Sequence, residues 1–181
     1  MLQITIPSIE LWDERTQEFT YLDERALQLE HSLVSISKWE SKWCKPFLSK
    51  DGLTREETID YIRCMTLTQN VDPDVYYRIT NDIIQKVNSY IDQPMTATWF
   101  PKDKRGGSNG EVTTNEIIYY WMISLNIPFD PCQKWHLNRL LTLIRVCENK
   151  NKPGRKMSGK EIRSQNAAIN AARRKRLNTK G

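Results

Sequence analysis

Thr113-Thr-Asn-Glu-Ile-Ile-Tyr-Tyr-Trp-Met-Ile-Ser-Leu125 is the stretch that decides the fold class of this chain. A threonine followed three residues later by Glu116 is the capping-box pattern, in which the two side chains satisfy free amide donors in the first turn of a helix. The residues after Glu116 are apolar at nearly every position, so the expected helix has no polar face to turn towards water. The stretch therefore predicts a helix that is central and buried.

Further helices are predicted on both sides of this one. Capping boxes also occur at residues 54–57, before a helix that extends to about residue 68, and at residues 158–161. An amphipathic segment follows at residues 80–91. Asp130 and Pro131 supply an N-cap and a proline at the first helical position, which predicts one long helix to about Glu148. The expected buried side of the helix after residue 54 consists of Ile59, Tyr61, Ile62 and Met65.

The N-terminal part of the chain combines strands with a helix. Residues 2–6 alternate apolar and polar side chains, as a half-buried strand does, and residues 9–12 and 18–21 are β-prone pieces flanking a polar loop. Together they predict a hairpin and a three-stranded sheet. From Asp23 the apolar spacing becomes helical and continues to the residues before Pro46. Trp39 and Trp43 then lie one turn apart on the same face.

The fold class that these elements predict is α+β and mainly α-helical. We expect about five helices and a small antiparallel N-terminal sheet. Residues 95–100 are also β-prone and are expected to pair with that sheet. The glycine-rich residues 106–110 read as a surface loop.

Charge divides the chain into two parts. The 181 residues carry a formal charge of +5. Residues 1–149 hold 16 basic and 21 acidic residues, which gives −5, whereas residues 150–181 hold 11 and 1, which gives +10. We therefore expect an acidic globular body over 1–149 and a basic, flexible or helical tail over 150–181. The candidate partner-binding residues are the tail cations Arg163, Arg173, Arg174, Lys175 and Arg176.

Composition excludes several classes of protein. The hydrophobic share of 39% and the six tryptophans argue against a disordered chain. The longest apolar run, residues 117–129, is too short to span the roughly 30 Å hydrocarbon core of a bilayer, so no membrane association is predicted. The N-terminal residues lack the basic region of a secretory signal, which predicts a cytoplasmic protein.

No residue pattern indicates catalysis, and we expect a non-enzymatic protein without cofactor or metal. The four cysteines contain no Cys-x-x-Cys pair. Cys132 and His136 would share a helix face, but a zinc site needs two more ligands, and a buried thiol beside a structural histidine is favoured. His31 lacks a nucleophile context and is expected to be structural or on the surface. The loop at residues 106–110 lacks the Gly-Lys-Ser/Thr ending of a phosphate-binding loop.

The tryptophans are more numerous than a chain of this length requires. Most are expected in the core, because a tryptophan at helical spacing buries a large area. One or two of them could anchor a protein interface, where tryptophan is enriched. The six are Trp12, Trp39, Trp43, Trp99, Trp121 and Trp135.

Several segments resemble a known family. They are Ser32-Leu-Val-Ser-Ile-Ser-Lys-Trp-Glu-Ser-Lys-Trp43, Asp60-Tyr-Ile-Arg-Cys-Met-Thr-Leu-Thr68, Met95-Thr-Ala-Thr-Trp-Phe100, Glu116-Ile-Ile-Tyr-Tyr-Trp-Met-Ile together with Trp135-His-Leu-Asn-Arg-Leu-Leu, and Asn166-Ala-Ala-Ile-Asn-Ala-Ala-Arg-Arg. They resemble tail-morphogenesis proteins of bacteriophages with long non-contractile tails (siphophages), and among these most of all the tail assembly chaperones. The resemblance covers nearly the whole chain and consists of packing signatures, with no active-site motif.

This resemblance implies a function. A tail assembly chaperone coats the helical tape measure protein in the host cytoplasm, keeps it from aggregating and helps to bring tail tube subunits onto it. Such chaperones often have a longer form made by translational frameshifting, and the basic tail would lie near that junction. The chain could also form a homo-oligomer.

Two other functions stay open. The first is a structural component of the virion, such as a tail or neck accessory subunit. The second is a nucleic-acid-binding phage protein, and there binding would depend on the basic tail alone.

Overall fold

The computed structural model describes residues 1–15, 17–49, 52–100, 112–151 and 159–177. The chain divides into two compact units, Met1–Glu148 and Asn149–Gly181. The fold is α+β and mainly helical, with antiparallel strands at the N-terminus, as the sequence predicts. The expected loop at residues 106–110 and the expected helix cap Ser158 lie outside the described residues.

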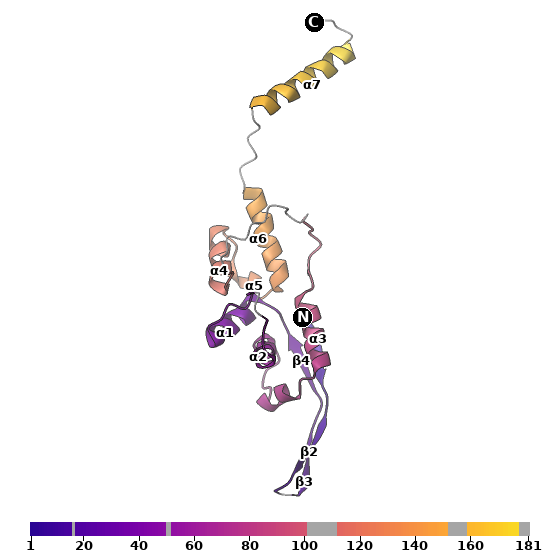
Figure 1. The fold of residues 1–181 in the computed structure, drawn as a ribbon, viewed down its shortest axis with the longest axis vertical. Coiled ribbons are helices and arrows are strands. Elements are labelled where there is room, and N and C mark those ends of the chain that lie inside the picture. Colours follow the sequence, from indigo (N-terminus) through magenta and orange to yellow (C-terminus); the bar gives the residue numbers. More distant parts are fainter. Residues whose placement is uncertain (16, 50–51, 101–111, 152–158, 178–181) are drawn as a thin grey trace. The chain divides into compact units, whose positions relative to one another are not determined.

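Among the described residues, four short strands form two separate two-stranded sheets, so the predicted three-stranded sheet is wrong. Strand β1 (Leu2–Ile6) pairs with β4 (Arg25–Leu29), and β2 (Ile9–Asp13) pairs with β3 (Glu18–Leu22) in the predicted hairpin. In Figure 1 this hairpin projects away from the other elements of the Met1–Glu148 unit. The β1–β4 pair instead contributes buried side chains to the core.

The helix predicted from Asp23 begins ten residues later, because β4 precedes it. Leu27 and Leu29 alternate with exposed neighbours and are buried, and Leu27 lies opposite Ile4 of β1. Apolar residues two apart fit a strand, yet they also occur by chance within a helical pattern. Pairing with β1 decided between the two periods, and helix α1 occupies Leu33–Trp43.

The next elements follow the predicted pattern closely. Thr54 and Glu57 form the expected capping box at the start of α2 (Arg55–Met65). A 3-10 helix, η1 (Pro73–Arg78), leads to α3 (Asn81–Ile91). Trp39 and Trp43 share a face of α1 as predicted, with their rings stacked 6.0 Å apart. Tyr61, Ile62 and Met65 are buried, whereas Ile59 is half-buried.

Helix α4 (Asn115–Ser124) differs from its prediction in two ways. Its N-cap is Thr114, with no side-chain cap hydrogen bond, so the capping box at Thr113 is not formed. The helix is also not buried all round, because Tyr120 is 65% and Ile123 is 62% exposed. Its core-facing residues are Asn115, Ile118 and Met122.

The long helix predicted from Pro131 is broken into two. Helix α5 (Phe129–Cys132) is a single turn, and α6 (Leu137–Asn151) begins only after His136. The break has a physical cause, since residue 136 forms a β-bridge with Ser32 and the N–H of Leu137 donates to the carbonyl of His31 at 2.8 Å. Residues 95–100, predicted as a strand, adopt no regular structure.

The core of Met1–Glu148 is one cluster to which the β1–β4 pair and helices α1 to α6 all contribute. Its largest fully buried side chains include Trp39 and Tyr61. The second unit contains α7 (Gly159–Leu177). Within the ranges given above, no helix combines the length and the apolar character needed to cross a membrane.

Candidate functional site

The two histidines lie together in the core. The Nδ1 atom of His31 and the hydroxyl of Tyr61 share a hydrogen bond of 2.6 Å, and the ring centroid of His136 lies 5.0 Å from that of His31. Burial, with a smaller contribution from His136, lowers the pKa of His31 to about 3. Burial also lowers the pKa of His136, whose Nε2 lies 3.1 Å from the carbonyl oxygen of Tyr90. Of the two expected positions for His31, the buried structural one is therefore observed.

Cys132 and His136 do not share a helix face, because the helix is broken between them. Cys132 is buried, and this burial raises the pKa of its thiol. In the described part of the chain, no three His, Cys, Asp or Glu side chains are grouped so that they could hold a metal ion. The pair therefore offers neither an activated thiolate nor a ligand set.

An exposed apolar surface lies on α4 and α5. We call Tyr119, Tyr120, Ile123 and Phe129 the α4 face. Positions three and four apart are neighbours on a helix, so Ile123 adjoins both Tyr120 and Tyr119, of which Tyr119 is partly buried against the core. Phe129 packs edge-on against Tyr119, with ring centroids 5.3 Å apart. The sequence showed this apolar character but not its exposure.

Charged side chains lie around the α4 face. Glu116 is exposed one turn before Tyr120, and Lys134 forms an ion pair of 2.6 Å with Asp130, the residue after Phe129. An apolar centre with a polar rim is the usual arrangement of a protein–protein interface. The α4 face has the character of a surface that binds another protein.

The α4 face is held in place by a buried carboxylate. Glu40 of α1 is 7% exposed, and its Oε2 accepts hydrogen bonds from the backbone N–H and the side-chain amide of Asn115, at 2.8 and 2.6 Å. Its Oε1 accepts a third, from the N–H of Phe47 at 2.7 Å. An anion at a helix N-terminus is stabilising, because free N–H groups and the helix dipole both favour it. Glu40 thereby replaces the threonine cap expected from the sequence.

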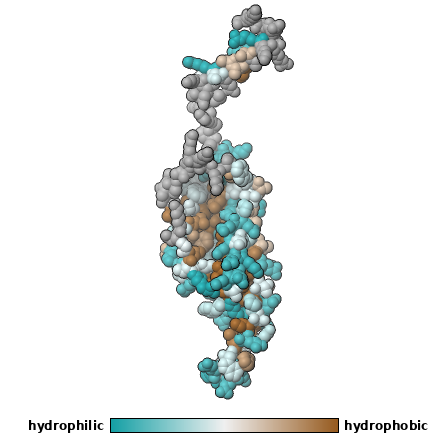
Figure 2. All heavy atoms as spheres, turned by 45° about the vertical axis from the view of Figure 1, so that its right-hand side comes forward, coloured by the Kyte–Doolittle hydropathy of each residue, from teal (hydrophilic) through white to brown (hydrophobic). Residues whose placement is uncertain are grey.

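A second exposed apolar surface lies on the hairpin, and we call residues 9–22 the arm. Trp12 faces Phe19 across the two strands, with ring centroids 4.8 Å apart. Both rings face solvent, since Trp12 is 51% and Phe19 is 68% exposed. Figure 2 shows hydrophobic side chains gathered on the hairpin at the lower end of the body, just above a hydrophilic tip.

The base of the arm is fixed by Arg78, the last residue of η1. Its Nη1 donates to the carbonyl oxygens of Pro7 at 2.9 Å and Asp23 at 3.1 Å, with a longer contact of 3.5 Å to Leu22. These carbonyls belong to the two chain segments that enter and leave the hairpin. One guanidinium thus joins both ends of the arm to the body, through charge-assisted hydrogen bonds.

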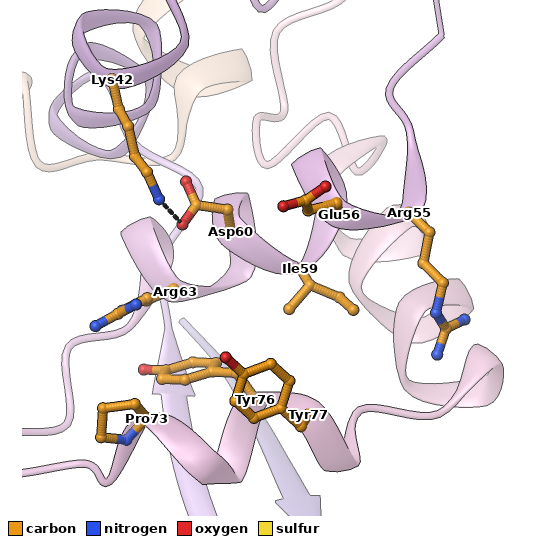
Figure 3. Close-up of a pocket in the computed structure, with 9 residues that line it drawn as sticks. All are labelled: Lys42, Arg55, Glu56, Ile59, Asp60, Arg63, Pro73, Tyr76 and Tyr77. Atoms are coloured by element: carbon orange, nitrogen blue, oxygen red, sulfur yellow. Dashed lines mark hydrogen bonds and ion pairs between the residues drawn. The ribbon is translucent and has the colours of Figure 1, made fainter.

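A groove of about 550 Å³ lies between α2 and η1 (Figure 3). We call it the α2–η1 groove. Ile59, Tyr76 and Tyr77 provide its apolar surface, and Arg55 and Arg63 stand on either side of the tyrosine rings. Its remaining lining residues are Lys42, Glu56, Asp60 and Pro73.

The charges of this groove are unevenly compensated. Lys42 forms an ion pair with Asp60, which also accepts a hydrogen bond of 2.8 Å from the indole N–H of Trp43. The Arg63 guanidinium lies 5.8 Å from the centre of the Tyr76 ring. Arg55 donates to two neutral oxygens, those of the Asn81 side chain and the Ile79 carbonyl. Neither arginine has a carboxylate partner in the described part of the chain.

The tail cations predicted to bind a partner lie on α7. Arg163, Arg173 and Arg174 are exposed, and Lys175 and Arg176 belong to the last turn of the same helix. Exposure meets the first requirement for a partner-binding role. Ile169, a large apolar side chain of the same helix, is 47% exposed.

The exposure of individual aromatic side chains is the feature of these surfaces that the sequence indicated least well. Trp12 and Trp99 are the exposed tryptophans, Trp39 is fully buried, and the others are partly buried.

Comparisons with protein-family models, with curated proteins and with solved structures found no match to this chain.

Proposed function

We propose that this protein is a non-enzymatic tail assembly chaperone that binds the tape measure protein of a siphophage in the host cytoplasm and assists assembly of the tail tube around it. The α4 face is the structural observation that carries the proposal, beside the sequence resemblance. A long amphipathic helix exposes an apolar stripe that must be covered in water. Aromatic and aliphatic side chains on a fixed helix can cover such a stripe by packing along it.

The size of the α4 face suits a partner bound by many copies. Helix α4 has ten residues, which correspond to a length of about 15 Å at 1.5 Å per residue. One copy therefore covers only two or three turns of a partner helix. A long tape measure protein would need a row of chaperones along its length.

The α4 face is also suited to release. Its four residues form a small patch, and the charged residues Glu116, Asp130 and Lys134 limit its extent. Small interfaces are typical of transient complexes. Tail tube subunits could therefore displace the chaperone without breaking a large hydrophobic interface.

Co-expression with the tape measure protein tests the proposal. The wild-type chain should raise the soluble yield of the tape measure protein and co-purify with it. The double variant Tyr120→Ser/Ile123→Ser should lose most of both effects, whereas Trp99→Ser, which removes an aromatic ring that is 80% exposed outside the α4 face, should keep them. Equal yields with and without the wild-type chain would reject the proposed function.

Mass spectrometry of washed virions separates the chaperone from a structural tail or neck subunit. The chaperone should be absent from mature particles, because it leaves as the tube forms. A structural subunit would be present at a fixed stoichiometry. Detection at such a ratio would favour the virion component over the proposed function.

A further inference from the structure

The arm carries apolar surface that its own chain leaves uncovered. The Trp12–Phe19 pair is half to two-thirds exposed, and Tyr21 of the same hairpin is also exposed. An isolated two-stranded hairpin is at best marginally stable in water. A hairpin of this kind with aromatic rings on its surface has the properties of an element that packs against another molecule.

The charge of the arm indicates what kind of surface it would contact. Residues 9–22 contain four acidic residues against one basic residue. Glu10, Glu14 and Glu18 are exposed. Pairing of two arms would bring like charges together, which is unfavourable across strands. The arm is therefore complementary to a surface that combines aromatic side chains with positive charge.

The α2–η1 groove has that combination, because its lining contains aromatic rings and three basic residues, Lys42, Arg55 and Arg63, against the two acidic residues Glu56 and Asp60. Tyr77, which is 83% exposed, and the half-buried Ile59 supply apolar and aromatic contact area, and the largely buried Tyr76 lies behind them. Arg55 and Arg63 flank this area and have no carboxylate partner in the part of the chain that the structure describes. The groove volume of about 550 Å³ lies within the range of about 300–1,000 Å³ that pockets for small ligands occupy, so aromatic side chains of the arm can enter.

A chain's own arm does not fill its own groove. Arg78 holds both ends of the arm, and the hairpin projects from the unit instead of folding back along η1 (Figure 1). Arg78 also follows Tyr77 directly in the sequence, so the arm begins beside the groove and points away from it. The occupant with the required chemistry is the arm of a second copy.

We infer that copies of this chain associate head to tail, with the acidic aromatic arm of one copy seated in the α2–η1 groove of the next. The contact is heterologous, because each copy contributes a different surface on either side. Heterologous contacts that do not close into a ring produce open rows. This association requires no tape measure protein, so it stands or falls independently of the proposed function.

Two variants, each of which lacks one of the two contact surfaces, test the inference. The arm variant Trp12→Ser/Phe19→Ser keeps an intact groove, and the groove variant Arg63→Glu/Tyr77→Ser keeps an intact arm. By sedimentation velocity, the purified wild-type chain should form a concentration-dependent series of oligomers. Each variant alone should be monomeric. An equimolar mixture should give a 1:1 dimer and nothing larger, because one intact arm and one intact groove remain to form a single contact.

Three results would overturn the inference: a wild-type chain that stays monomeric at millimolar concentration, a groove variant that still self-associates, or a mixture without a dimer. The second result would indicate arm-to-arm pairing. The control Trp99→Ser should associate as the wild type does. Unchanged far-UV circular dichroism would show that each variant is folded.

A charge exchange avoids the loss of aromatic side chains. Glu14→Lys/Glu18→Lys should abolish association while keeping Trp12 and Phe19. Adding Arg55→Glu and Arg63→Glu to the same chain should restore it, since the charges are then reversed on both surfaces. Absence of this rescue would contradict the inference. Co-expression with the tape measure protein remains a separate readout. Loss of self-association would reject the inference without rejecting the proposed function, and an unchanged yield of the tape measure protein would do the reverse.

Discussion

The buried carboxylate of Glu40 accepts two hydrogen bonds from Asn115, one from its backbone N–H at 2.8 Å and one from its side-chain amide at 2.6 Å. The two residues are 75 positions apart in the chain. This contact joins α1 to the first turn of α4, and it fixes the direction in which the α4 face points. A third hydrogen bond, from Phe47, completes the set of donors.

Replacing Glu40 with alanine should therefore destabilise the protein. The change leaves two buried N–H groups of Asn115 and the partly buried N–H of Phe47 without acceptors, and each unsatisfied buried group costs about 1–3 kcal/mol. Because the donors can relax together, we expect a loss of about 3 kcal/mol in the free energy of unfolding, measured by urea denaturation. Glu56→Ala, at an exposed position of α2, should change it by less than about 1 kcal/mol. Equal losses in the two variants would contradict the assigned role.

The stability of the protein should fall in mild acid because of His31. Its folded pKa of about 3 lies below the unfolded value of 6.5, so the unfolded state binds the extra proton between these limits. The contribution of neutral His31 to the free energy of unfolding is then fully present above pH 6.5 and decreases as the pH falls towards 3. At pH 5 the loss from this group is about 2 kcal/mol. His136 lies beside His31 and contributes to the total slope, because burial also lowers its pKa.

Chemical denaturation at pH 7, 6 and 5 measures this effect. The variant His31→Gln should be less stable than the wild type at pH 7, yet it should lose less stability between pH 7 and pH 5. In this variant His136 still contributes a smaller part of the pH dependence of stability, because its pKa is also lowered. Parallel profiles for the wild type and the variant would show that His31 does not titrate as described.

Arg78→Ala should release the base of the arm. The carbonyls of Pro7 and Asp23 lose their charged donor, while the aromatic side chains of the arm and the groove stay unchanged. Amide hydrogen exchange in residues 9–22 should become faster than in the wild type, because local opening of the hairpin costs less. Arg25→Ala, an exposed substitution in β4, is the matched control. If amide hydrogen exchange in the arm of the Arg78→Ala variant is unaltered, Arg78 does not hold the base of the arm.

Any affinity for DNA or RNA should depend on the basic tail. Deleting residues 152–181 removes ten of the eleven tail cations and should abolish binding. In the full chain, affinity should fall steeply as salt rises, because phosphate contacts release counterions. Fluorescence anisotropy with a labelled oligonucleotide at several salt concentrations measures both effects. Binding that survives the deletion would assign nucleic-acid contacts to the acidic body.

Local signals in the sequence predicted the elements that depend on neighbouring residues. The strand at Leu2–Ile6, the hairpin and the cap at Thr54 were all predicted, because turn and cap chemistry involves residues a few positions apart. Strand β4 was missed because Leu27 and Leu29 fit two periods. Only their pairing with β1, more than twenty residues earlier, distinguishes these periods.

The candidate surfaces could not be predicted in the same way. The apolar character of α4 is visible in the sequence, but whether Tyr120 is covered depends on how the other helices pack. The α2–η1 groove joins Lys42 of α1 to Tyr77 of η1, residues far apart in the chain. The Glu40–Asn115 contact has no local signature at all. The sequence shows the residue types, and tertiary packing decides which of them face water.

Tyr77 and Arg78 are consecutive residues of one short 3-10 helix. Tyr77 helps to receive an incoming arm, and Arg78 aims the outgoing arm of the same chain. The rotation from one copy to the next is therefore set within a single turn of backbone, without an intervening hinge. A row of such copies would wind as a screw of constant pitch, so that every α4 face repeats at a regular angle around a common axis.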